Sequence, residues 1–362
     1  MHPLLALPSE ILSEIFVQCL PPYPICPPLL GDSSPTKLTQ VCRRWREIAH
    51  ATPELWRGIA LFTSAGLRRF SELQVATAEV WIKRSGALPL CVILGSTPHG
   101  EPEAKGVSLL LEHRSRWQYA ALRCRVSEWI PGRAPECEMP FLRQLDLMYS
   151  DQPQEPIEDL GTLDAPHLTT VFLDCDLVLN LNESPTVLAG LLVWIQLTRV
   201  FLCNIDFDSA VGVLHHATNL VACRLEFERW SPPDGGPNLQ PGTVFVFPRL
   251  ETLIITAVFS NYEQLDELLL AIRAPNLRRL HLDHDMLAHR DGEDSLQLTP
   301  DSLGCAVERL LLSITNIRGP LESIRNSIPR VGMIEMSSTE DLSSDVWGHW
   351  DLGRLWQGND TV

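Results

Sequence analysis

The sequence has 362 residues, enough for two or three domains or for a small module joined to an elongated repeat body. Its 45 acidic and 29 basic residues give a formal charge of −16, which argues against a nucleic-acid backbone as the main partner. It contains no run of about 18 apolar residues and no apolar stretch typical of a secretion signal. We therefore expect an intracellular protein, cytoplasmic or nuclear, without a membrane partner.

Two amphipathic stretches open the chain. In residues 7–20, LPSEILSEIFVQCL, apolar side chains recur at helical spacing after Pro8, and they predict one helix. After a proline-rich gap, Ser34 and Pro35 provide a cap and a first-turn proline for a second helix that runs past Trp45. Thr52 begins a third, short helix in the same way. A unit this small buries too little surface to be stable alone, so a partner or the rest of the chain must cover it.

At these residues the chain resembles the F-box, the adaptor-binding module of cullin-RING ubiquitin ligases, in the F-box-like form of a large fungal family. The gap from Pro21 to Pro35 is longer and richer in proline than in the plain F-box. The resemblance implies that Leu55 and Trp56 join the module to the body. It also implies an adaptor-binding surface made by Leu7, Pro8, Ile11, Leu12, Ile15, Phe16, Val41, Cys42 and Trp45.

Residues 61–116 are predicted to connect the module (residues 1–60) to the body. Ser71 and Gln74 have the spacing of a capping box for a helix that passes Trp81 and stops before Gly86. The apolar run 88–94 predicts a buried strand, and residues 96–106 predict a loop. The resemblance to the fungal proteins extends to about residue 94.

A leucine-rich pattern repeats across residues 117–337. Its first positions run from Tyr119 to Ile328, separated by 21 to 30 residues, which suits leucine-rich repeats with some longer units. Helix start signals, such as Asp208 and the pair Ser260 and Glu263, fall between the strand candidates. We therefore expect an α/β fold: a short all-α module followed by an irregular leucine-rich-repeat-like solenoid, with a parallel sheet on one side and helices outside. An ordinary α/β domain is the alternative. Residues 338–362 form an acidic tail that contains tryptophans.

Catalytic and metal-binding patterns are missing from the sequence. It has no G-x-S-x-G, P-loop, G-x-G-x-x-G or H-E-x-x-H motif, so we expect no enzyme, no cofactor and no metal site. The ten cysteines occur singly and mostly at apolar positions, which favours buried free thiols over disulfides or metal ligands.

Recognition is the remaining function. Residues that alternate with the inward leucines point to the other face of the sheet, where arginine and aromatic side chains suit an interface. The alternative is that loops or the tail cover this face. The candidate target-binding residues are Phe172, Arg199, Phe201, Arg224, Arg279 and His281.

Together, the resemblance and the repeats predict a substrate-recognition subunit of an SCF-type ubiquitin ligase. The module would bind the Skp adaptor, and through it a cullin, while the body would hold an unknown target protein. A scaffold without a role in ubiquitination, and a repeat-type interaction protein with a decayed F-box, are the alternatives.

Overall fold

The computed structural model describes residues 7–62, 71–95, 101–124, 138–149, 163–174, 192–227, 239–240, 242–257, 262–283, 307–313 and 332–337. The chain divides into two compact units. Among the described residues, the first unit holds 7–149 and 163–168, and the second holds 169–337. Each unit is an α/β structure built on parallel strands, which confirms the predicted fold class at that level.

The first unit begins with helices α1 (Ser9–Gln18), α2 (Leu38–Val41) and α3 (Arg43–His50), the last two preceded by a short 3-10 helix η2 (Pro35–Lys37). The predicted second helix is therefore divided. The backbone of Cys42 is extended, with φ −158° and ψ 171°, and its Sγ accepts a hydrogen bond from the Trp45 amide at 3.4 Å. Cys42 thus ends α2 and caps α3. The predicted third helix is the 3-10 helix η3 (Pro53–Trp56).

The sheet of the first unit follows directly. Its parallel strands lie in chain order: β1 (Gly58–Phe62), β2 (Leu90–Gly95), β3 (Trp117–Cys124) and β4 (Gln144–Tyr149). Strand β2, LCVILG, is buried along almost its whole length, as expected for a strand that is covered on both faces. The strand ladder therefore begins at β1, upstream of residue 117.

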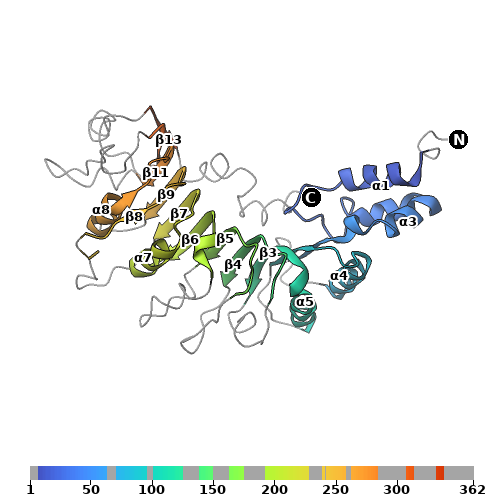
Figure 1. Ribbon diagram of the computed structural model, residues 1–362. Helices are drawn as coiled ribbons and strands as arrows, with labels where there is room; N and C mark the ends of the chain where they lie inside the picture. Colours follow the sequence, from blue (N-terminus) through green and yellow to red (C-terminus); the bar gives the residue numbers. More distant parts are fainter. Residues whose placement is uncertain are drawn as a thin grey trace. The chain divides into compact units, whose positions relative to one another are not determined.

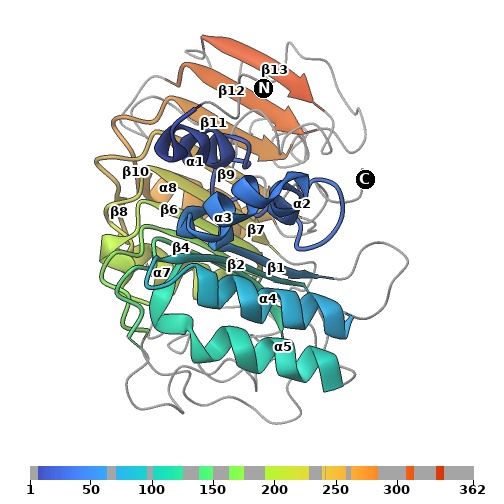
Figure 2. The same cartoon turned by 90° about the vertical axis from the view of Figure 1, so that its right-hand side faces the viewer.

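Two helices cover one side of this sheet. Helix α4 (Glu72–Arg84) packs on β1, and α5 (Glu101–Glu112) lies beside α4 (Figure 2). The predicted capping box is present, with Ser71 and Gln74 bonding each other's backbone amides. Helix α5 contradicts the predicted loop at residues 96–106, because the helix begins at Glu101. A short 3-10 helix η4 (Arg114–Arg116) leads into β3.

The second unit continues the same design. Its sheet has the order β5 (Thr170–Asp174), β6 (Arg199–Ile205), β7 (Ala222–Phe227), β9 (Thr252–Ala257), β11 (Arg279–Asp283), β12 (Arg309–Ser313) and β13 (Met333–Ser337), all parallel. Helices α7 (Phe207–His216) and α8 (Tyr262–Ala271) lie on one side of it (Figure 1). The unit also has a short 3-10 helix, η7 (Trp194–Gln196). Strands β8 (Phe245–Val246) and β10 (Ile272–Arg273) form a separate parallel pair.

Burial alternates along β5, β6 and β7 as the leucine pattern predicts, whereas β9, β11 and β12 also bury side chains between the inward leucines. In β5, for example, Val171 and Leu173 are buried while Phe172 is partly exposed. The pattern was misplaced at both ends. Register aligns Ala120 and Leu122 with the leucines of β4, so the β3 repeat starts at Trp117 and not at Tyr119. Register likewise aligns Ile334 with Leu310, so Met333 is not an inward position.

The predicted tail, residues 338–362, lies outside the described residues. Among the helices that are described, none combines the length and the apolar character needed to cross a membrane.

Candidate functional site: the N-terminal helices and the outer sheet face

Helix α1 has two apolar faces with different surroundings. Leu12 and Phe16, one turn apart, are each 1% exposed and form the inner face of the helix. Ile11 and Ile15, also one turn apart, are 49% and 39% exposed. Val41, the last residue of α2, is 60% exposed. The N-terminal module therefore presents large apolar side chains to solvent while its own core is filled.

The inner face holds α1 against α3. The ring of Phe16 lies 4.9 Å from that of Trp45, measured between centroids, and Arg44 donates a hydrogen bond to the carbonyl of Leu7. Of the predicted adaptor residues, Leu12 and Phe16 are buried on the inner face of α1. Pro8, Ile11, Ile15 and Val41 are exposed, and Leu7, Cys42 and Trp45 are partly buried.

The joint between module and sheet is aromatic. Trp56 is fully buried, and its Nε1 donates to the Ala49 carbonyl at 2.9 Å. Its ring packs against that of Trp81 in α4, and the guanidinium of Arg84 lies over it at 4.9 Å. Leu55 is also fully buried. These contacts connect Trp56 to α4, the helix that packs on β1.

The proline-rich insertion at residues 21–35 is packed against the sheet. A Cβ built on Gly58 of β1 would lie 2.8 Å from the Pro27 side chain, so the insertion passes directly over this strand. The Tyr23 hydroxyl donates to the Glu54 carbonyl at 3.2 Å, and the Arg57 guanidinium lies 4.9 Å from the Tyr23 ring. Burial raises the pKa of Tyr23 far above its ordinary value. The insertion therefore belongs to the core of the first unit.

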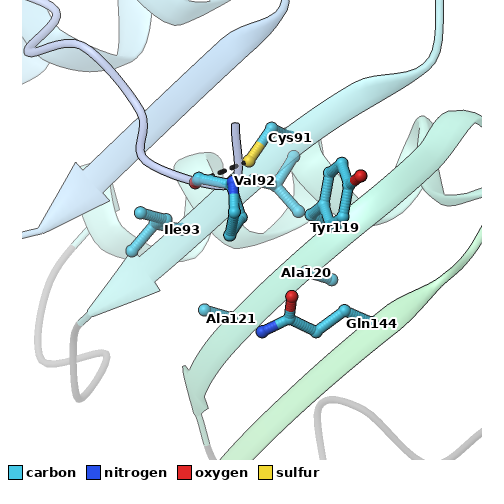
Figure 3. A pocket seen from close by; sticks show the side chains of 8 residues that line it. Cys91, Val92, Ile93, Tyr119, Ala120, Ala121 and Gln144 are labelled. Atoms are coloured by element: carbon cyan, nitrogen blue, oxygen red, sulfur yellow. Dashed lines mark hydrogen bonds between the residues drawn. The ribbon is translucent and has the colours of Figure 1, made fainter. Parts of the chain in front are cut away.

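A hollow lies beside the insertion, on the face of β2, β3 and β4 (Figure 3). Cys91 donates from its Sγ to the Pro24 carbonyl at 3.0 Å, which seats the insertion at the edge of this hollow. Gln144 is 3% exposed, and its Oε1 has no hydrogen-bond partner in the part of the chain that the structure describes. The lining residues are Pro24, Cys91, Val92, Ile93, Tyr119, Ala120, Ala121 and Gln144.

On the second unit, the face opposite the buried leucines is here called the outer face. Register places one side chain from each of neighbouring strands in a single cross-strand row, called the outer row. Its members are Phe172, Phe201, Arg224, Ile254, His281 and Leu311. The candidate target residues Arg199 and Arg279 lie two positions earlier on the same face.

One end of the outer row is an aromatic and charged cluster. The Phe172 and Phe201 rings meet edge to face with centroids 4.2 Å apart, and the Arg224 guanidinium lies 4.3 Å from the Phe201 centroid. Arg224 also pairs with Glu226, whose other carboxylate oxygen accepts from the Cys203 thiol at 2.9 Å. Register places Arg199 beside Ala222 and not beside Arg224. The cluster is thus a preformed, partly exposed patch.

The other end of the row is covered. His281 is 4% exposed and Ile254 is 2% exposed, although alternation alone would leave both in solvent. Burial, and secondarily the charge of Arg224, lowers the pKa of His281 to about 4, so its imidazole is neutral at pH 7. Gln144 and Asp146 on β4 of the first unit are likewise buried, although they alternate with the inward residues Leu145 and Leu147. The alternation of the strand predicts which face of the sheet these side chains lie on, but it does not predict whether other residues bury that face.

Among the described residues, no group of three or more histidine, cysteine or acidic side chains could hold a metal ion. Comparison with curated proteins finds no match to this chain. Comparison with protein-family models finds one for residues 4–61, the F-box-like family. The exposed isoleucines of α1, the capped α3 and the buried joint at Trp56 all lie in that interval, so the N-terminal part of the chain is an F-box-like domain.

Proposed function

We propose that this protein is a substrate-recognition subunit of an SCF-type ubiquitin ligase. F-box domains generally bind Skp adaptors, and the F-box-like match at residues 4–61 supports the same contact here. The adaptor would connect the chain to a cullin, and the body would present a target protein. The chain would then act by proximity, raising the effective concentration of target lysines near the charged ubiquitin carrier.

The observation that carries this proposal is the exposure of Ile11 and Ile15. Exposing two branched apolar side chains to water is unfavourable: full burial of an isoleucine is worth about 1.5–3 kcal/mol, and these two are 49% and 39% exposed. Ile11 and Ile15 are not part of the core of the module, which is filled by Leu12 and Phe16. A partner that covers α1 explains their position.

We propose the second unit as the target-binding body, with its parallel strands as an irregular leucine-rich-repeat-like solenoid. The cluster of Phe172, Phe201 and Arg224 is its best candidate anchor, because these side chains are already ordered against one another before a target binds. In the first unit, the insertion occupies the corresponding face over β1 and β2, so that part of the sheet is closed to a target.

Binding of the Skp adaptor tests the first half of the proposal. The full chain is purified with the adaptor as wild type and as the double variant Ile11→Asp with Ile15→Asp. We expect loss of at least tenfold in affinity, because two buried carboxylates without partners oppose association. The matched control is Leu73→Asp with Val80→Asp, which changes two apolar residues of α4 that are 62% and 42% exposed. Equal binding by the α1 variant and the control would refute the adaptor surface.

Ubiquitin transfer tests the second half. The target is a protein whose co-purification with the chain is lost when Phe172 and Arg224 are substituted. A ligase reconstituted with adaptor, cullin and this chain should attach ubiquitin to that protein. The scaffold alternative predicts adaptor binding and target binding without transfer of ubiquitin.

A further inference from the structure

Two buried cysteines meet where the insertion crosses the sheet. Cys26 belongs to the insertion, in a segment without helix or strand, and Cys91 is in β2. Their Sγ atoms lie 3.3 Å apart although the residues are 65 positions apart in the chain. Cys26 is 2% exposed and Cys91 is 1% exposed, and both are free thiols in this structure.

Hydrogen bonds fix both sulfurs. Cys91 donates to the Pro24 carbonyl at 3.0 Å, while Cys26 lies 3.5 Å from the Cys91 carbonyl. Burial, followed by the contact with Cys26, holds the pKa of the Cys91 thiol well above its ordinary range. Cys91 is therefore protonated and slow to attack an oxidant, although it stays aligned with its neighbour.

We propose that Cys26 and Cys91 are an oxidation site, at which a hydroperoxide converts the two thiols into a disulfide that fastens the insertion to β2. The sulfurs need to approach by only about 1 Å to reach the bonded distance of about 2 Å. The inference does not depend on adaptor binding, because the pair lies between the insertion and the sheet of the same unit.

The chemistry has two steps. The Cys26 sulfur attacks one peroxide oxygen, the O–O bond breaks, and Cys26 becomes a sulfenic acid while the other oxygen leaves as water or alcohol. The Cys91 sulfur then attacks the sulfenic sulfur, the S–S bond forms, and the S–O bond breaks. The released oxygen leaves as water with the proton of Cys91. Two thiols thereby lose two electrons and two protons, and the peroxide is reduced.

Cys26 reacts first because of its position. It lies outside the strand ladder, so a local opening at Cys26 would break no strand pairing, whereas Cys91 is paired between β1 and β3. Cys91 then acts as the resolving thiol, for which alignment matters more than a low pKa. Closure of the bond encloses α2, α3, β1 and α4 in one covalent loop, which restricts the unfolded chain and stabilises the fold.

Peptide mapping of the oxidised full chain tests the site. The folded protein is treated with hydrogen peroxide, free thiols are blocked, and non-reduced peptides are analysed by mass spectrometry. We expect a linked pair containing Cys26 and Cys91 that disappears after reduction. We also expect the Tm of the oxidised protein to rise by about 5 °C or more and to return on reduction.

Three cysteines provide the controls. Cys19 is exposed and reports whether the peroxide has reacted at all. Cys223 is as buried as Cys91, and burial raises its pKa to about 12, so Cys223→Ser should keep the linked peptide and the Tm shift. Cys26→Ser should lose both. The proposal is wrong if Cys26 and Cys91 remain free thiols while Cys19 is oxidised, or if Cys26 is linked to Cys19 or Cys42 instead.

Discussion

The indole of Trp56 packs edge-on against that of Trp81, with ring centroids 5.4 Å apart and an interplanar angle of 67°. Both side chains are fully buried. Trp56 ends η3 and Trp81 lies in α4, which packs on β1, so this contact connects the N-terminal helices to the helix that covers the sheet.

Trp56→Ala should therefore lower the free energy of unfolding by about 3–5 kcal/mol, the usual cost of removing a buried indole. Urea unfolding followed by circular dichroism measures the change. Leu73→Ala on the exposed side of α4 is the control and should change stability by no more than about 0.5 kcal/mol. If Trp56→Ala lowers the free energy of unfolding by less than about 1 kcal/mol, the contact between Trp56 and Trp81 does not stabilise the fold as expected.

Trp45→Ala should weaken adaptor binding by about 2 kcal/mol or more, because the large ring supports α1 through Phe16. Calorimetric titration with the Skp adaptor measures the affinity. Trp45→Phe keeps an aromatic ring against Phe16 and should retain most of the affinity for the adaptor. Near-unchanged affinity for a folded Trp45→Ala protein would remove Trp45 from the adaptor surface.

Gly58→Ala should destabilise the first unit by about 1–3 kcal/mol, the usual cost of overpacking, because the added methyl would meet Pro27 at 2.8 Å. The double variant with Pro27→Ala should recover part of that loss, since removal of the proline ring frees the space. A double-mutant cycle in urea measures the coupling. Additive effects of the two changes would show that the insertion does not press on β1.

The elements with complete local signals were predictable. Ser71 and Gln74 fix the start of α4, and Gly86, with φ +59°, follows its end, so the helix could be placed from sequence. The leucine spacing likewise predicted that Phe172 and Phe201 lie on the same face of the sheet, where their rings meet. In each case the determining contacts are close in sequence or follow from the alternation of a strand.

Other features depend on distant contacts. Nothing near Cys42 marks it as a helix break, and only its extended backbone and its bond to Trp45 reveal it as a cap. Helix α5 was missed because Pro102 and Gly106 favour a loop, whereas the helix buries its apolar residues Val107 and Leu110 in the folded unit. The contact between Cys26 and Cys91 could not be predicted from nearby residues, because the two cysteines are 65 positions apart.

The burial of His281 leads to a prediction about pH. Its pKa is about 4 in the folded protein, below the ordinary value of 6.5, so the unfolded chain takes up the proton first as pH falls. Stability is thus unaffected by this group above about pH 6.5, declines between about pH 6.5 and 4, and loses up to about 3 kcal/mol in total.

His281→Leu should remove this part of the pH dependence, because the neighbours of His281 in the outer row, Ile254 and Leu311, are apolar and accept a leucine between them. Tm measured for both proteins from pH 7.5 to pH 4 provides the comparison. The curves should lie roughly parallel above pH 6.5 and then separate, with the wild type falling more steeply. Curves that stay parallel down to pH 4 would mean that His281 is protonated in the folded state, with its charge stabilised by Glu226 or another acidic group that outweighs Arg224.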